Sequence, residues 1–335
     1  MNAHALAATA QALVADHKGL LAMDESSGTC RKRFVEQGIE DSEAMRRAYR
    51  ELLITAPGLA ESVSGLILFD ETLHQAHADG TPFVALIERA GMIPGIKVDL
   101  GAKPLAGHPG ETVTEGLDGL RERLQAYAAK GARFAKWRGV INIGEQLPSR
   151  AGIAANAHAL ARYGALCQEA GLVPIIEPEV LMDGAHSLAR CAEVTERTLQ
   201  AVFAELAAQG VLLEGMLLKP NMVTAGAASP SQGSLEAVAS ATLACLRRCV
   251  PAAVPGIAFL SGGQSPELAS AHLNAMHQQG PLPWALTFSY GRALQQPALA
   301  AWNGQAANVA AAQQALLKRA RGNRAACLGN YQQAA

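Results

Sequence analysis

Ionisable side chains in this sequence gather at the carboxyl ends of short apolar segments. Asp24 ends the segment GLLAMD, and Lys219 ends the segment MLLK. Three other segments end in ionisable pairs spaced two apart, and these pairs are Lys97 with Asp99, Lys136 with Arg138, and Glu177 with Glu179. Residues two apart in a strand point to the same side, and a charge inside a core is costly unless it is paired or used. Each charge alone is explained by a solvated strand end, but their shared register predicts one functional pocket.

Three lysines among carboxylates indicate amine chemistry. Lys219 follows three apolar residues and precedes a proline, so it has the most apolar surroundings of the three. A lysine attacks a carbonyl group only as the free amine, and burial or a neighbouring cation lowers its pKa toward that form. Lys136 can supply the neighbouring charge, while Asp24, Glu177 and Glu179 can transfer protons. The pattern is typical of a lysine that forms a Schiff base.

Two glycine-containing segments near the end of the chain are candidates for phosphate binding. The sequence SGG occupies 261–263, and SYGR occupies 289–292. Glycine permits close backbone approach to an anion, and Arg292 can bind phosphate oxygens in pairs. Each segment follows an apolar run, which is where phosphate-binding loops lie in α/β barrels. Two ordinary glycine turns are the alternative interpretation.

Eight short apolar runs start 28 to 46 residues apart. They lie at Gly19–Asp24, Gly65–Asp70, Ile93–Asp99, Arg133–Arg138, Val173–Glu179, Met216–Lys219, Gly256–Leu260 and Ala285–Tyr290. Helical patterns lie between them, most clearly at Glu115–Lys130, Ala154–Glu169, Arg190–Ala208, Leu235–Cys249 and Pro266–Gln279. Short buried strands that alternate with helices predict parallel β/α units. Eight units predict an α/β fold, a (β/α)8 TIM barrel with extra N-terminal and C-terminal helices, whose functional face is the carboxyl end of the strands.

No linker or change of composition divides the chain. We therefore expect one domain over residues 1–335, with a short C-terminal tail from about residue 321. A doubly wound open sheet is the structural alternative. That fold would need a glycine-rich loop after the first strand, and the sequence DESSG at 24–28 is not one.

Charge and cysteine usage limit the classes of partner. The 28 basic and 29 acidic residues give a net charge of −1, which provides no field for nucleic acid or for an anionic membrane. The six cysteines are scattered without a CxxC pair, which favours free thiols in a reducing compartment. The first fifteen residues read as an amphipathic helix rather than a signal peptide. We expect a cytoplasmic protein.

Metal binding has little support in the sequence. The nine histidines include no HExxH motif. His74 and His77 lie three apart on an expected helix face, and His272 and His277 lie on or near another. We interpret all four as solvated helix positions. No metal and no cofactor are predicted.

Seven segments of the chain together resemble those of one known enzyme family. They are LLAMDESSGT, GIKVDLG, FAKWR, VPIIEPEVLMDGAH, LLKPNMVT, FLSGGQS and LTFSYGRALQ. In this order they resemble class I fructose-1,6-bisphosphate aldolases, from about Gly19 to about Tyr331. The resemblance implies a (β/α)8 barrel, usually a homotetramer without metal, that acts in glycolysis and gluconeogenesis. Such enzymes reversibly cleave fructose 1,6-bisphosphate to dihydroxyacetone phosphate and glyceraldehyde 3-phosphate.

The resemblance also implies a role for each matching residue. Lys219 matches the Schiff-base lysine, Glu177 the acid and base of carbinolamine dehydration, and Asp24 the base for the C4 hydroxyl. Lys136 matches the lysine that stabilises charged intermediates, and Glu179 helps to set the local electrostatics. The residues implied to bind substrate are Arg138, with Ser261, Gly262, Gly263, Ser289, Gly291 and Arg292 at the dihydroxyacetone phosphate side, and Ser26, Arg33 and Lys97 near the other phosphate.

The C-terminal segment departs from the animal members of that family. Those members carry a longer tail with a terminal tyrosine that helps to protonate the enamine, whereas only four residues follow Tyr331 here. We expect Glu177, or a water that it holds, to be the acid instead. Two functional alternatives remain open at this point. One is an aldolase for another phosphorylated ketose such as sedoheptulose 1,7-bisphosphate, and the other is a catalytically silent barrel used as a binding scaffold.

Overall fold

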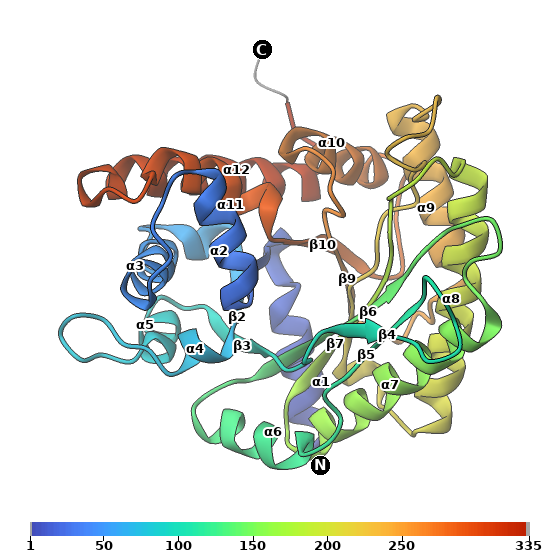
Figure 1. Ribbon diagram of the computed structural model, residues 1–335, viewed down its shortest axis with the longest axis horizontal. Helices are drawn as coiled ribbons and strands as arrows, with labels where there is room; N and C mark the ends of the chain where they lie inside the picture. The colour runs from blue at the N-terminus through green and yellow to red at the C-terminus, as the bar shows by residue number, and fades with distance from the viewer. Residues whose placement is uncertain (1, 333–335) are drawn as a thin grey trace.

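The computed structural model describes residues 2–332, and within them a closed barrel of eight parallel strands forms the centre (Figure 1). Its strands are β1 Gly19–Met23, β2 Val63–Leu68, β3 Ile93–Lys97, β6 Phe134–Ile141, β7 Val173–Val180, β8 Leu217–Leu218, β9 Gly256–Phe259 and β10 Ala285–Tyr290. Neighbours in the barrel are neighbours in the chain, and β10 closes the barrel against β1 with Ser289 opposite Leu20. The predicted barrel is confirmed, and the open sheet is ruled out because no barrel strand is left as an edge.

Helices surround the barrel in the described part of the chain (Figure 1). They are α1 Ala3–Leu13, α2 Ser27–Glu36, α3 Glu43–Ile54, α4 Asp70–Leu73, α5 Phe83–Arg89, α6 Leu120–Ala129, α7 Arg150–Glu169, α8 Leu188–Ala208, α9 Leu235–Cys249, α10 Pro266–His277, α11 Arg292–Trp302 and α12 Val309–Cys327. Short 3-10 turns occupy Ala15–His17, Leu59–Glu61, Leu213–Gly215 and Ala306–Asn308. An antiparallel hairpin of β4 Ala102–Pro104 and β5 Thr112–Thr114 lies between β3 and α6.

Serine residues begin many of these helices. The side chains of Ser26, Ser42, Ser149, Ser187, Ser234 and Ser265 each accept a hydrogen bond from a backbone N–H in the first turn of the helix that follows. Such a cap satisfies one of the free amides at a helix start and contributes about 1 kcal/mol. Helix α6 begins at Leu120, later than the pattern from Glu115 predicts, because Gly119 at its start has a φ of 65°.

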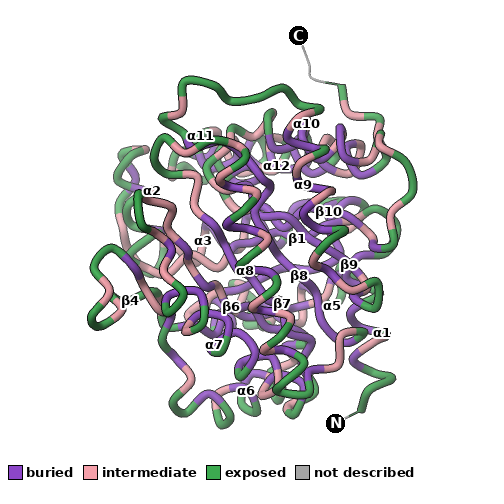
Figure 2. Tube along the Cα trace, turned by 90° about the vertical axis from the view of Figure 1, so that its right-hand side faces the viewer, coloured by how far each residue is buried: buried purple, intermediate pink, exposed green. Residues whose placement is uncertain are grey.

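The interior of the barrel is apolar at its amino-terminal end, and α1 covers that end. Leu6, Ala10 and Leu13 of α1 belong to the same buried cluster as Phe134 and other inward-facing strand residues. A Cβ atom at Gly95 would lie 2.3 Å from the ring of Phe134, so a glycine is required beside that aromatic side chain. Figure 2 shows that the residues at the centre of the molecule are mostly buried and that the exposed residues lie mostly in the outer turns. The carboxyl end of the barrel is therefore the end that remains open to a ligand.

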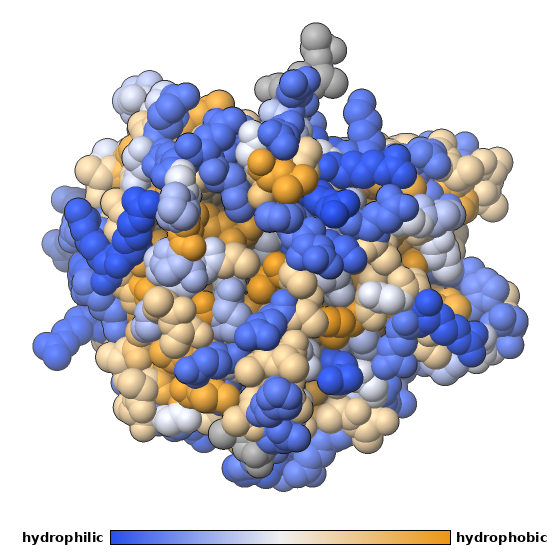
Figure 3. All heavy atoms as spheres, turned by 180° about the vertical axis from the view of Figure 1, so that it is seen from behind, coloured by the Kyte–Doolittle hydropathy of each residue, from blue (hydrophilic) through white to orange (hydrophobic). Residues whose placement is uncertain are grey.

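The last helix packs against α10 and α11. The segment from residue 321, where we expected a tail to begin, is still helical in α12 as far as Cys327. The backbone N–H of Tyr331 donates to Oδ1 of Asn274 at 2.8 Å, and its ring lies against Gly322. The face shown in Figure 3 is mostly hydrophilic with smaller apolar areas between. No helix in residues 2–332 is long and apolar enough to cross a bilayer.

Candidate active site

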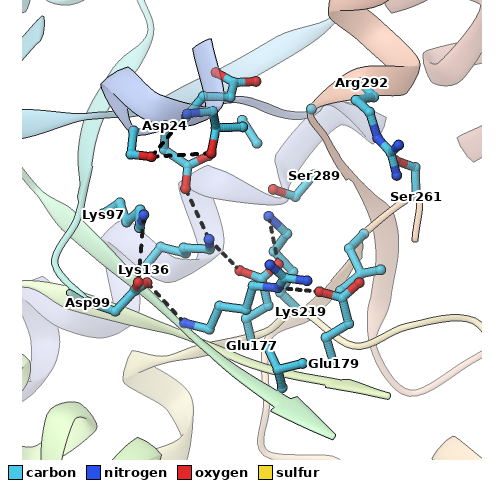
Figure 4. Close-up of a pocket in the computed structure, with 18 of the residues that line it drawn as sticks. Asp24, Lys97, Asp99, Lys136, Glu177, Glu179, Lys219, Ser261, Ser289 and Arg292 are labelled. Carbon is cyan, nitrogen blue, oxygen red and sulfur yellow. Dashed lines mark hydrogen bonds and ion pairs between the residues drawn. The ribbon is translucent and has the colours of Figure 1, made fainter. Parts of the chain in front are cut away.

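A cavity of about 410 Å³ opens at the carboxyl ends of the barrel strands (Figure 4). Nearly all of the residues predicted to act on substrate line it, and these are Asp24, Ser26, Arg33, Lys97, Lys136, Arg138, Glu177, Glu179, Lys219, Ser261, Gly262, Ser289, Gly291 and Arg292. Gly263 lies next to the cavity, where a Cβ atom would be 3.4 Å from the Arg292 guanidinium. The prediction that the charged strand ends share one pocket agrees with this arrangement.

Four charged side chains form the centre of the cavity. Nζ of Lys136 lies 3.0 Å from Oδ2 of Asp24 and 2.9 Å from Oε2 of Glu177. The other oxygen of Glu177, Oε1, lies 3.3 Å from Nζ of Lys219. Figure 4 shows Lys136 between the two carboxylates and Lys219 on the far side of Glu177. Lys136 is thus paired twice, whereas Lys219 has one carboxylate.

Strand register places these side chains. Lys136 of β6 lies opposite Lys97 of β3, and Arg138 lies opposite Glu177 of β7. The short strand β8 ends before Lys219, whose backbone N–H donates to the carbonyl oxygen of Ile176 at 2.8 Å. Although β8 has only two residues, this hydrogen bond extends its pairing with β7 by one residue. The backbone position of Lys219 is therefore set by β7.

The two central lysines differ in their preferred protonation state. Burial lowers the pKa of Lys219, and the positive charge of Lys136 lowers it further, against the attraction of Glu177. For Lys136 burial acts in the same direction, but Asp24 and Glu177 outweigh it and raise the pKa above its usual value. Burial opposes the charge on Asp24, yet the surrounding lysines hold the pKa of this carboxyl well below its usual range. Of the two lysines, Lys219 is therefore the one that loses its proton more readily, beside a charged Lys136 and an ionised Asp24.

Two further ion pairs lie in the wall of the cavity, and they hold the side chains of Lys97 and Arg138 in place. Nζ of Lys97 lies 3.7 Å from Oδ1 of Asp99, and Asp99 also accepts backbone hydrogen bonds from Gly101 and Arg138. Nε of Arg138 donates to Glu179. Lys97 and Asp99, predicted to share a strand face, thus form an ion pair, whereas Arg138 and Glu179 pair across two neighbouring strands.

The two glycine-containing segments meet on one side of the cavity. Gly262 and Gly263 have φ values of 59° and 90°, which a residue with a Cβ atom rarely adopts. The Arg292 guanidinium lies over Gly263, in space that a side chain there would narrow. Oγ of Ser289 is buried and has no hydrogen-bond partner within residues 2–332. A buried hydroxyl without a partner beside an arginine and two glycines is suited to an anion.

The wall of the cavity beside Asp24 contains a carboxylate that we did not predict. Glu25 pairs with Arg33, and its Oε2 lies 2.8 Å from NH1 of the buried Arg50. Nε2 of Gln295 also donates to Glu25 at 2.8 Å. These contacts orient Arg33 and hold the segment that carries Asp24. Glu25 stands beside Asp24 in the sequence, but two of its three partners lie 25 and 270 residues away, so no local pattern indicates the whole set.

The environments of the histidines differ from the solvated helix positions that the sequence predicted. His272 is buried rather than solvated: burial lowers its pKa to about 4, and its Nδ1 lies 2.6 Å from Oε1 of Gln264. His277 contacts the carbonyl oxygen of Leu286 at 3.0 Å. His74 and His77 follow the end of α4 and do not share a helix face. Within the described residues no three histidine, cysteine or carboxylate side chains are grouped to hold a metal ion.

A buried lysine beside paired carboxylates, at the carboxyl ends of barrel strands, is an arrangement suited to an enzyme that uses a lysine amine. Residues 5–335 match the sequence profile of the family described as fructose-bisphosphate aldolase class-I. The chain is 58% identical over 332 residues to a probable fructose-bisphosphate aldolase class 1 of Xanthomonas axonopodis pv. citri, with 99% of both chains covered. It is 56% identical over 315 residues to cytosolic fructose-bisphosphate aldolase 4 of Arabidopsis thaliana, covering 94% of this chain and 80% of the relative.

Solved structures agree with the sequence comparisons. A fructose-bisphosphate aldolase from Plasmodium falciparum, solved in complex with TRAP and a small-molecule inhibitor, superimposes with a TM-score of 0.98. Its sequence is 49% identical, and the match covers 99% of this chain and 96% of that one. The chain belongs to the class-I fructose-bisphosphate aldolase family.

Proposed function

We propose that this aldolase cleaves fructose 1,6-bisphosphate reversibly through an imine on Lys219, as a step of glycolysis and gluconeogenesis. The observation that carries the proposal is the contrast between the two central lysines. Lys219 is buried with one carboxylate at 3.3 Å, whereas Lys136 is held between two carboxylates at 2.9 and 3.0 Å. Lys219 is therefore the amine that most readily loses its proton and attacks a ketone.

The first half of the reaction forms the imine. The Nζ of Lys219 adds to C2 of the ketose, and the carbinolamine loses its hydroxyl as water after Glu177 supplies a proton. Glu177 lies beside both lysines, so it can receive a proton and return it without moving. The protonated imine withdraws electrons from C3, which is the role that a metal ion plays in other enzymes.

The second half breaks the carbon–carbon bond. Asp24 removes the proton of the C4 hydroxyl, the C3–C4 electron pair moves to form the enamine, and glyceraldehyde 3-phosphate leaves. Asp24 suits this role because the lysines around it keep it ionised. The enamine then takes a proton at C3, and water releases dihydroxyacetone phosphate and the free Lys219 amine. Lys136 stabilises the changing charge between the two carboxylates.

The phosphates of the substrate are assigned to opposite sides of the cavity. Ser261, Gly262, Gly263, Ser289, Gly291 and Arg292 bind the phosphate on the dihydroxyacetone side. Ser26, Arg33 and Lys97 bind toward the other end, and Arg138 is a further substrate-binding residue. The unpartnered hydroxyl of Ser289 and the exposed guanidinium of Arg292 support this assignment.

We also infer that the chain is a single-domain enzyme that works in the cytoplasm as a homotetramer, without nucleic acid or membrane partners. The cytosolic name of the Arabidopsis relative supports the compartment. The net charge of −1 supports the absence of a nucleic-acid partner. The seven-carbon bisphosphate is not favoured, because the matched family and the relatives named above all carry the fructose bisphosphate name.

Product analysis tests the proposed reaction. Purified enzyme incubated with fructose 1,6-bisphosphate should release dihydroxyacetone phosphate and glyceraldehyde 3-phosphate in equal amounts, measured by enzymatic coupling or mass spectrometry. The Lys219→Arg variant keeps a cation but no free amine and should be inactive. Equal turnover by this variant and the native enzyme would contradict the proposed route.

A further inference from the structure

Arg319 of α12 is a buried arginine that lies outside the cavity and makes contacts with two other helices. Its NH2 donates to the carbonyl oxygen of Pro266 and to Oγ of Ser270 at 2.7 Å, both in α10. Its Nε donates to the carbonyl oxygen of Ala293 in α11 at 3.4 Å. Figure 1 shows α12 beside α10 and α11. One guanidinium therefore joins the first turns of two helices that belong to different β/α units.

The surroundings of Arg319 form a mostly buried polar network. Ser270 is fully buried, and its hydroxyl lies 2.5 Å from Oδ1 of Asn323, one turn after Arg319 on α12. NH1 of Arg319 lies 3.3 Å from Glu267, a half-exposed carboxylate at the start of α10. Removing an arginine from such a place leaves buried carbonyl and hydroxyl groups without partners, which is costly.

The helix starts that Arg319 joins follow directly from the two phosphate-binding segments. Helix α10 begins at Pro266, just after 261–263, and α11 begins at Arg292 itself. The strands before them pair only as far as Phe259 and Phe288. Beyond that pair, within the described chain, no backbone hydrogen bond joins residues 260–265 to residues 289–293. Beyond the paired strands, side-chain contacts therefore contribute to the spacing of the two segments.

We propose that Arg319 is a positioning residue that fixes the distance between the two halves of the phosphate-binding side of the cavity. The proposal rests on the phosphate assignment made under the proposed function. Tyr290 provides a second link, because its buried hydroxyl donates to the carbonyl oxygen of Ala269 at 2.9 Å. Arg319 differs from Tyr290 in holding the first residues of both helices, next to Arg292.

The geometry requires an arginine rather than any cation. The planar guanidinium directs separate N–H groups at fixed angles, so that one side chain reaches two helices at the same time. A lysine at this position has one ammonium group on a flexible stem and cannot reproduce both directions. A lysine at position 319 is therefore not expected to keep the two phosphate-binding segments at their native distance, although it keeps the positive charge.

Reductive trapping with two ketones separates positioning from general damage. Sodium borohydride inactivates the enzyme at the imine, and the ketone concentration that gives half-maximal inactivation is measured for dihydroxyacetone phosphate and for dihydroxyacetone. The variants are Arg319→Met and Arg319→Lys. Arg321→Met is the matched control, since it makes the same change at an exposed position of the same helix. Arg292→Ala shows how far the half-saturating concentration of dihydroxyacetone phosphate rises when a residue assigned to bind the phosphate directly is removed.

For Arg319→Met we expect the half-saturating concentration of dihydroxyacetone phosphate to rise about tenfold, because a small displacement of an oriented group has a large effect. The value for dihydroxyacetone should stay unchanged, since that ketone has no phosphate to misplace. Arg319→Lys should resemble Arg319→Met, and Arg321→Met should resemble the native enzyme. Ser270→Ala keeps Arg319 but removes one of its partners, so it should give a smaller rise in the same direction even if Arg319→Met does not fold.

The outcomes distinguish the two proposals. If the native enzyme shows no preference for dihydroxyacetone phosphate over dihydroxyacetone, the phosphate assignment itself is wrong. If the native enzyme shows the preference and the folded Arg319 and Ser270 variants keep it, Arg319 does not position the site. Equal weakening for both ketones would also overturn the proposal, because it would indicate a general loss of structure.

Discussion

At the residue scale, the site depends on which of two nearby lysines carries a proton. Each is buried, and a buried ammonium ion is favourable only where carboxylates surround it. Lys136 lies within 3.0 Å of both Asp24 and Glu177, so the proton stays there. Its charge then disfavours a second proton on Lys219. Burial is thus the larger cause of the lowered pKa of Lys219, and the charge of Lys136 adds to it.

The substitution Lys136→Met tests this coupling. It removes the positive charge that lowers the pKa of Lys219, and it leaves Glu177 to attract a proton onto Lys219 without competition. Both effects raise the pKa of Lys219, so the free amine appears only at higher pH. The midpoint of the pH dependence of imine trapping with dihydroxyacetone phosphate should move upward.

Lys32→Met is the control for that experiment, because Lys32 is an exposed lysine on α2. Its midpoint should equal that of the native enzyme. A midpoint for Lys136→Met that is unchanged or moves to lower pH would contradict the coupling, whatever the loss in the overall rate.

At the scale of elements, the strands were more predictable than their connections. Each of the eight apolar runs overlaps a barrel strand, and the helix predicted at Leu235–Cys249 has those same bounds. Buried strands and amphipathic helices leave a periodic pattern in the sequence. The hairpin strands β4 and β5 are mostly not buried, so they carry no apolar run that would predict them.

His272 shows why burial on a helix is harder to predict than the helix itself. The sequence places this residue on α10, but only the tertiary structure brings Gln264 to its Nδ1. Gln264 also donates to the carbonyl oxygen of Ser261 at 3.0 Å. The histidine therefore supports the turn next to the phosphate-binding side rather than facing solvent.

A pH prediction follows from the burial of His272. Its pKa falls from 6.5 to about 4 in the folded protein, so between these values the unfolded chain binds more protons. Stability then decreases as pH falls through this window. His272→Asn, whose amide can still donate to Gln264, should reduce the slope of unfolding free energy against pH by up to about 1.4 kcal/mol per pH unit between pH 6.5 and 5.

Urea unfolding at a series of pH values measures this slope. The exposed His4→Asn provides the control and should leave the slope as it is in the native enzyme. A steeper or equal slope for His272→Asn would show that His272 is protonated in the folded protein at these pH values.

At the scale of the whole molecule, contacts between distant parts of the chain complete the site. Motifs in the sequence indicate Asp24, Glu177 and Lys219, because each ends a strand at the same end of the barrel. They do not indicate Glu25 or Arg319, whose partners lie up to 270 and 53 residues away. The charged residues that line the cavity were therefore predictable from local patterns, whereas Glu25 and Arg319 were not.

The C-terminal segment carries a prediction at this scale. Tyr331 contacts Asn274 and Gly322 of the outer helices and is not among the described residues that line the cavity. Tyr331→Phe should therefore leave proton exchange at C3 of dihydroxyacetone phosphate nearly intact, measured by loss of tritium or deuterium to water. Glu177→Gln is the positive control and should slow the exchange. A hundredfold drop for Tyr331→Phe, about 2.7 kcal/mol in the barrier, with the fold preserved would identify Tyr331 as the acid.

The central claim is that Lys219, and not another lysine of the cavity, forms the covalent intermediate. Borohydride reduction in the presence of fructose 1,6-bisphosphate, followed by peptide mass spectrometry, tests it most directly. We predict stoichiometric inactivation with the reduced adduct on Lys219 and with Lys97 and Lys136 unmodified. An adduct on Lys136 or Lys97, or full activity after reduction with no adduct, would contradict the account.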